Sequence, residues 1–150
     1  MPKYLQLEEV GTPAAQLFGK RLKERRLSLG YTQAQLFEQT GKFDALVCTA
    51  GNVNFVALGD MSESDFELGL RDKLMGQVNL ALVGQQFLVD GGSITLTSGV
   101  LRDQPVPHGA AASLANGGIE AFVRAAAIEL PRALRINAVS PGVLAESMDS

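Results

Sequence analysis

Several features that mark secreted, metal-binding and membrane proteins are scarce in this sequence of 150 residues. Its one cysteine, Cys48, excludes an intramolecular disulfide and suits a reducing compartment. One histidine and no cysteine cluster leave no metal-binding spacing, so we expect no metal site. No apolar run reaches the roughly 18 residues that span a bilayer, and the first ten residues lack the apolar stretch of a signal peptide. We therefore expect a cytoplasmic protein without a membrane segment.

Charge is distributed unevenly along the chain, although its composition, 46% hydrophobic and 19% charged, is that of one globular core. Residues 1–42 hold seven Lys/Arg and four Asp/Glu, a net charge of +3. Residues 43–150 hold six Lys/Arg and twelve Asp/Glu, a net charge of −6. The net charges of the two stretches add up to the −3 of the whole sequence. The two stretches carry net charges of opposite sign, and we therefore place a domain boundary between residues 42 and 43.

The basic first stretch has the pattern of two short α-helices. Leucines are spaced for one helical face between residues 14 and 29, and Thr32 with Gln35 has the pattern of a capping box. Gly30 and Tyr31 lie between these patterns and predict a turn. Residues 1–42 are therefore expected to form an α-helical segment.

From Phe43 onward, strand-length apolar runs alternate with long helical patterns. Strands are expected at residues 44–48, 93–98 and 135–139. Helices are expected from Ser62, with apolar residues every fourth position between 66 and 82, and from Gly109 to Leu130. The first strand has the composition of one buried on both faces, and Asp90-Gly91-Gly92 predicts a turn. This order is that of a parallel α/β sheet with right-handed crossovers, with three strands present.

In open α/β sheets, ligands bind beyond the carboxyl ends of the strands. Gly51 follows the first expected strand and would let a ligand approach the backbone, and Ser98 ends the second and offers a hydroxyl above the sheet. The alternative is that glycine and serine stand there because they suit turns. Spacing alone does not decide between the two interpretations.

Four sequence segments resemble the short-chain dehydrogenase/reductase family. FDALVCTAGN is similar to its fourth strand and Asn-Ala-Gly loop, and GSITLTSGV to its fifth strand with the catalytic serine. AFVRAAAIEL and RINAVSPGV resemble the helix after the active-site lysine and the sixth strand. The resemblance covers residues 43–150. It implies an incomplete Rossmann-like, doubly wound sheet, oxidoreduction with NAD or NADP, and Ser98 as the catalytic serine.

Other catalytic positions of the family are replaced in this chain. The family's tyrosine falls on Ala112 and its lysine on Asn116, so neither the proton donor nor the charge that tunes its pKa is present. Lys73 stands where the family has a catalytic asparagine, and Glu146 where a threonine usually follows the sixth strand. We expect the ordinary proton relay to be lost.

The cofactor side of the site is also reduced. The resemblance implies that Ala50, Gly51, Pro141 and Gly142 lie against NAD or NADP. The family's Gly-x-x-x-Gly-x-Gly turn, which holds the pyrophosphate, is not found in these 150 residues. We therefore expect cofactor binding to be lost.

The basic stretch of residues 1–42 resembles a different class of protein. GKRLKERRLSLGYTQAQL is similar to the first two helices of a phage-repressor type helix-turn-helix, over about residues 14–41, with Gln33 at a phosphate contact. The alternative is a solvated basic helix face. The sequence that follows Gly41 is strand-like, so the recognition helix is missing and we expect nucleic-acid binding to be absent or weak and non-specific. The chain is either a junction of two unrelated fragments or a natural truncated paralogue.

We expect a dehydrogenase-like domain that is catalytically inactive, with helix-mediated association as the alternative function. In the family, the helices after the fourth and fifth strands commonly pair with their copies in a second subunit. The alanines and glycines between Ala110 and Gly118 would permit close helix approach. We therefore expect a homo-oligomer formed through the helix from Gly109 to Leu130, and His108 and Cys48 to have no catalytic role.

Overall fold

The computed structural model describes residues 24, 27–28, 30 and 42–142, and it divides the chain into two compact units, Met1–Lys42 and Phe43–Ser150. In the first unit Glu24, Leu27 and Ser28 are helical, and Gly30 lies in a turn with φ of +75°. The rest of the predicted helix-turn-helix lies outside the described residues. It includes Gln33 and the basic residues Lys20, Arg21, Lys23, Arg25 and Arg26. That resemblance stays a prediction.

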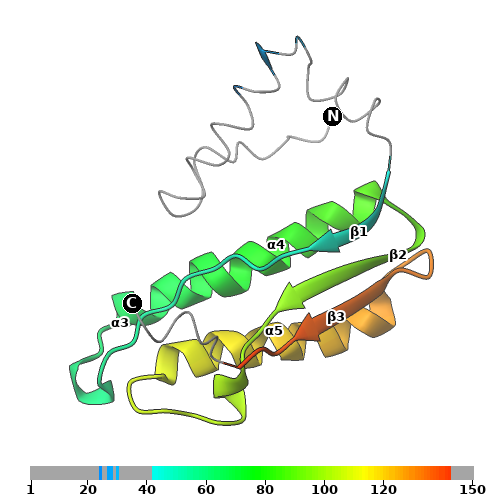
Figure 1. The fold of residues 1–150 in the computed structure, drawn as a ribbon. Helices are drawn as coiled ribbons and strands as arrows, with labels where there is room; N and C mark the ends of the chain where they lie inside the picture. The colour runs from blue at the N-terminus through cyan, green and yellow to red at the C-terminus, as the bar shows by residue number, and fades with distance from the viewer. Residues whose placement is uncertain (1–23, 25–26, 29, 31–41, 143–150) are drawn as a thin grey trace. The chain divides into compact units, whose positions relative to one another are not determined.

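The second unit consists of three strands connected by helices (Figure 1). In chain order the main elements are β1 (Phe43–Val47), α3 (Glu63–Leu68), η2 (Gly69–Leu74), α4 (Met75–Gly84), β2 (Leu88–Thr97), α5 (Ala110–Glu129) and β3 (Arg135–Val139). Single 3₁₀ turns lie at η1 (Leu58–Asp60), η3 (Gln85–Phe87) and η4 (Val100–Arg102). The strands pair in parallel in the order β1-β2-β3, which confirms the predicted α/β, Rossmann-like fold class.

The second strand is longer than its sequence pattern predicts. It begins at Leu88 and includes the expected turn at Asp90-Gly91-Gly92, where Gly91 has φ of +74°. The register between β1 and β2 shifts at this point. Phe43 lies opposite Leu88, whereas Ala45, two residues later, lies opposite Ser93. The turn signal therefore corresponds to a bulge inside the strand, since glycine adopts positive φ without steric cost.

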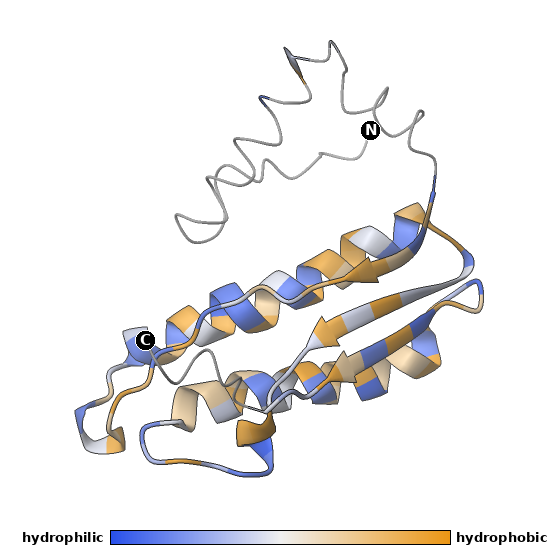
Figure 2. Cartoon of the chain, in the orientation of Figure 1, coloured by the Kyte–Doolittle hydropathy of each residue, from blue (hydrophilic) through white to orange (hydrophobic). Residues whose placement is uncertain are grey.

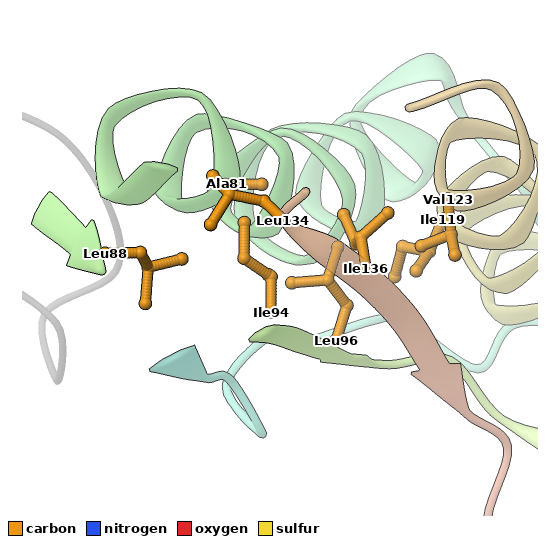
Figure 3. Packing of buried hydrophobic residues seen from close by; sticks show 8 residues of the cluster. All are labelled: Ala81, Leu88, Ile94, Leu96, Ile119, Val123, Leu134 and Ile136. Atoms are coloured by element: carbon orange, nitrogen blue, oxygen red, sulfur yellow. The ribbon is translucent and has the colours of Figure 1, made fainter. Parts of the chain in front are cut away.

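The hydrophobic core lies on one face of the sheet. Ile94 and Leu96 of β2 are fully buried and pack with Ile136 of β3, against Ala81 of α4 and Ile119 of α5 (Figure 3). Both long helices therefore cover the same face, and apolar and polar residues alternate along them (Figure 2).

No helix within the described residues is long and apolar enough to cross a membrane.

The opposite face of the sheet is exposed at several positions. Side chains alternate between the two faces of a strand, so Val47 and Val139 point away from the core. Their exposed fractions are 63% and 53%, and Phe43 is 46% exposed. The expectation that the first strand is buried on both faces is therefore wrong.

The first long helix contains a π-helical segment. Ser62 is the N-cap of α3, as predicted, and it also forms a capping box in which its backbone N–H donates to Asp65 at 2.9 Å. Hydrogen bonds from Ser62 lower the pKa of the Asp65 carboxyl. Residues Gly69–Leu74 then form a π-helix before α4 begins. A π segment displaces the following residues around the helix axis, so Gln77 and Ala81 are buried while Leu82, in the predicted apolar series, is 49% exposed.

We predict that Leu96→Ala lowers the free energy of unfolding by about 2–5 kcal/mol, because a fully buried side chain leaves a cavity on truncation. Val139→Ala is the matched control on the exposed face and should cost less than about 1 kcal/mol. Urea unfolding followed by circular dichroism measures both. Equal losses for the two variants would contradict the one-sided core.

Candidate functional site

The loops that follow the three strands meet at the carboxyl edge of the sheet. The backbone N–H of Ser98 donates to the Val139 carbonyl at 2.9 Å, and that of Val100 donates to the Pro141 carbonyl at 3.1 Å. The N–H of Cys48 donates to the Thr95 carbonyl at 2.9 Å. The structure therefore brings together the predicted positions at the ends of β1, β2 and β3.

A buried glutamine from α4 joins the ends of β1 and β2. The Gln77 side chain, 1% exposed, donates to the carbonyls of Ala50 at 3.2 Å and Thr97 at 2.9 Å. Its amide oxygen accepts from the Thr97 N–H at 2.8 Å. All these polar groups are thus satisfied in a buried setting. Sequence reasoning missed Gln77, and the available signal was an uncharged polar residue within a mostly apolar helical stretch, a signal that Asn79 shares.

The loop after β1 packs against the π segment. Gly51 has φ of +137°, and a Cβ added there would lie 2.6 Å from the Cα of Lys73. The backbone N–H of Asn52 donates to the Asp72 carboxylate at 2.7 Å. Glycine is therefore required here for the close approach of the Lys73 backbone, and the contact of Gly51 with a cofactor stays a prediction.

Lys73 lies beside Asn116, so two positions that depart from the family pattern contact each other. The Lys73 ammonium donates to the Asn116 amide oxygen at 2.6 Å and to the Ser98 carbonyl at 3.0 Å. Asn116 is 2% exposed and Lys73 is partly buried. Burial lowers the pKa of Lys73 from its ordinary value of 10.5, because desolvation disfavours the charged form.

The Ser98 hydroxyl does not point to open space above the sheet. Ser98 is 2% exposed, and its Oγ donates to the Glu120 carboxylate at 2.6 Å. The other oxygen of that carboxylate is paired with Arg102. A Cβ added at Gly99 would instead meet the Asn116 side-chain nitrogen at 2.7 Å. The Ser98 hydroxyl is therefore bound within the chain, and its catalytic role stays a prediction, whereas a side chain at position 99 would face that of Asn116.

The remaining predicted positions differ in their exposure. Ala112 is 1% exposed, whereas Pro141 and Gly142 are exposed. Glu146 lies outside the described residues. His108 has φ of +66° and lines a mostly apolar cavity of about 320 Å³. The residues that line this cavity are Val56, Leu58, Pro105, Val106, His108, Gly109, Ala110 and Ser113.

Comparison with known proteins agrees with this arrangement of strands and loops. A model of the family described as enoyl-(acyl carrier protein) reductase matches residues 28–150. The chain belongs to the short-chain dehydrogenase/reductase family. The match begins before Phe43 and so includes part of the segment for which we predict a repressor-like pattern.

Relatives of this short-chain dehydrogenase/reductase domain include enzymes of fungi. The chain is 33% identical to the versicolorin reductase stcU of Emericella nidulans over 116 residues, which are 76% of this chain and 44% of that protein. The curated relatives that it matches first are thus more than twice as long as the matched segment.

Two solved structures have the same fold. The protein lin1944 from Listeria innocua is 45% identical, with a TM-score of 0.72 over 77% of this chain and 57% of that one. A small-chain dehydrogenase solved in complex with NADPH is 34% identical, with a TM-score of 0.66 over 76% of this chain and 56% of that one.

We predict that Gln77→Leu lowers the free energy of unfolding by roughly 2–4 kcal/mol, since it leaves the Thr97 and Ala50 backbone groups unsatisfied. Asn79→Leu makes the same chemical change at an exposed position of α4 and should cost less than about 1 kcal/mol. Urea unfolding measures the stability of both variants. Hydrogen exchange at the Thr97 amide should accelerate in Gln77→Leu alone, and an unchanged exchange rate would argue against the role of Gln77.

Proposed function

We propose that this chain is a short-chain dehydrogenase/reductase-like domain that does not catalyse tyrosine-dependent carbonyl reduction. The observation that carries this proposal is the environment of α5 at the edge of the sheet. Ala112, at the expected tyrosine position, presents a buried methyl group, which neither donates nor accepts a proton. Asn116, at the expected lysine position, carries no charge and is held by Lys73.

Two of the predicted cofactor positions make contacts within the chain, and this supports the proposal that a dinucleotide does not bind. The space in front of Gly51 is filled by the Lys73 backbone, and the Ala50 carbonyl accepts a hydrogen bond from Gln77. Both residues are exposed, so these contacts use only one side of each residue. No Gly-x-x-x-Gly-x-Gly turn is present in residues 1–150 to hold a pyrophosphate.

We predict that NADH and NADPH bind this chain weakly or not at all, because the backbone donors for the pyrophosphate are missing. Fluorescence titration and calorimetry measure the affinity. A dissociation constant in the low micromolar range for either nucleotide would contradict the proposal.

The same proposal can be tested by reintroducing the tyrosine and lysine of the family's proton relay. The variant needs Ala112→Tyr and Asn116→Lys together with Lys73→Asn, because two ammonium groups would otherwise face each other at the distance now bridged by a hydrogen bond. We expect no turnover on a panel of carbonyl compounds, since hydride transfer requires a bound cofactor. The matched control is Lys73→Asn with Asn116→Lys, which lacks the tyrosine. Turnover that depends on the tyrosine would show that a cofactor site exists.

A second candidate function is self-association through the long helices, and exposed apolar side chains on α5 favour it. The alanine surface that we expected to carry this contact faces inward, since Ala111 and Ala115 are 2% and 0% exposed. Gly118 is also used within the chain, because a Cβ there would meet Leu74 at 2.8 Å. Leu114 and Ile128, which are 50% and 87% exposed, share the outer face of the helix instead.

We predict that Leu114→Glu with Ile128→Glu shifts the chain toward a monomer, because like charges would face each other across a symmetric helix contact. Light scattering at several protein concentrations measures the mass. Leu58→Glu, at an exposed apolar position outside both long helices, is the control and should leave the mass unchanged. A monomeric wild-type chain would rule out association.

A further inference from the structure

The Lys73 ammonium has one hydrogen-bond donor that the described residues do not use. An ammonium group has three N–H donors. Two of them go to the Asn116 amide oxygen at 2.6 Å and the Ser98 carbonyl at 3.0 Å. Within residues 42–142 no further acceptor lies within hydrogen-bond distance of Nζ. The third N–H is therefore available to a ligand.

The charge of Lys73 is also uncompensated within the described part of the chain. Both of its acceptors are neutral oxygens, and no described carboxylate forms an ion pair with it. The neighbouring Asp72 carboxylate accepts from the Asn52 backbone, and Glu120 is bound by Ser98 and Arg102. A partly buried charge without a counter-ion is unfavourable, and its lowered pKa reflects the same desolvation. An anion at the third donor would relieve that cost.

The position of the ammonium is fixed before any ligand arrives. Gly51 packs directly on the Lys73 backbone and side chain, and Asn116 is buried in α5. Lys73 itself lies within the π-helical segment, a feature that often occurs at functional sites. A donor that is already ordered loses little conformational entropy on binding.

We propose that Lys73, positioned by Asn116 and the Ser98 carbonyl, is the donor of an oxyanion-binding subsite at the carboxyl edge of the sheet. The ligand group is a carboxylate or phosphate oxygen, which would accept a charge-assisted hydrogen bond from the third N–H. This subsite does not depend on whether the chain reduces carbonyl compounds. The anion would lie on the side of the Lys73 ammonium that neither the Asn116 amide nor the Ser98 carbonyl occupies.

Nuclear magnetic resonance tests this proposal with acetate and inorganic phosphate as probes. The Asn116 side-chain amide is the reporter, because it contacts Lys73 directly. Sodium acetate or sodium phosphate should shift this signal in a saturable way, while sodium chloride at matched ionic strength should not. A response to acetate alone indicates a carboxylate ligand, and a response to phosphate alone a phosphate ligand. The absence of a saturable shift with both anions would overturn the proposal.

Anion affinities of variants distinguish a direct contact with Lys73 from the effect of the net charge of the protein. Lys73→Asn should weaken anion binding by about tenfold or more, since it removes the charged donor. Arg71→Gln removes an exposed charge two residues away and should leave the affinity within about twofold. The exchange Lys73→Asn with Asn116→Lys returns an ammonium to the same place from α5 and should restore binding. Unchanged affinity in Lys73→Asn would refute the subsite.

A measurement on the unmodified chain covers the case in which Lys73→Asn does not fold. Acetic anhydride acetylates lysine amines, and mass spectrometry follows each site separately. Saturating acetate or phosphate should slow acetylation of Lys73 relative to that of Lys42, which is exposed. Equal rates with and without the anion would count against binding at Lys73.

Discussion

The carboxyl edge of this domain depends on one buried side chain, the amide of Gln77. Its three hydrogen bonds connect the end of β2 to the loop after β1, at the position where the two strands separate. A buried amide must have its donors and acceptor satisfied, and here the strand ends supply all the partners. Because Gln77 comes from α4, the same contacts hold the helix against the edge of the sheet. The positions of Gly51 and Lys73 follow from this attachment.

The chemistry at this edge differs from the family's in a specific way. The short-chain dehydrogenase/reductase fold is kept, while Ala112 and Asn116 stand where the sequence resemblance predicts the family's tyrosine and lysine. A lysine from the π segment places its ammonium against that amide, so a cation remains within the site although it comes from another helix. Ser98, which the sequence resemblance assigns to catalysis, joins β2 to α5 through a hydrogen bond to Glu120. The described site therefore contains a positive charge on Lys73 and a serine hydroxyl that is bound within the chain.

Much of the fold could be predicted because hydrophobic spacing reports local structure directly. The strand-length run predicts the third strand at residues 135–139, where it is observed, and the helical pattern predicts α5 within one residue at each end. The burial of β1 was predicted wrongly, since an apolar strand has the same composition whether one face or both are covered. The face of α4 was also misplaced, because an i, i+4 series assumes a regular helix and the π segment interrupts it.

The sequence alone determined the family and the parallel order of the strands, because both are encoded in residue type and local spacing. Only the tertiary structure decided which side chains meet. The contact between Lys73 and Asn116 joins residues 43 positions apart, and that between Ser98 and Glu120 joins residues 22 apart. The direction of a side chain at the end of a strand depends on register and on the helix packed against it. That is why Ser98 points into the protein and Gly99 lies against the Asn116 side chain.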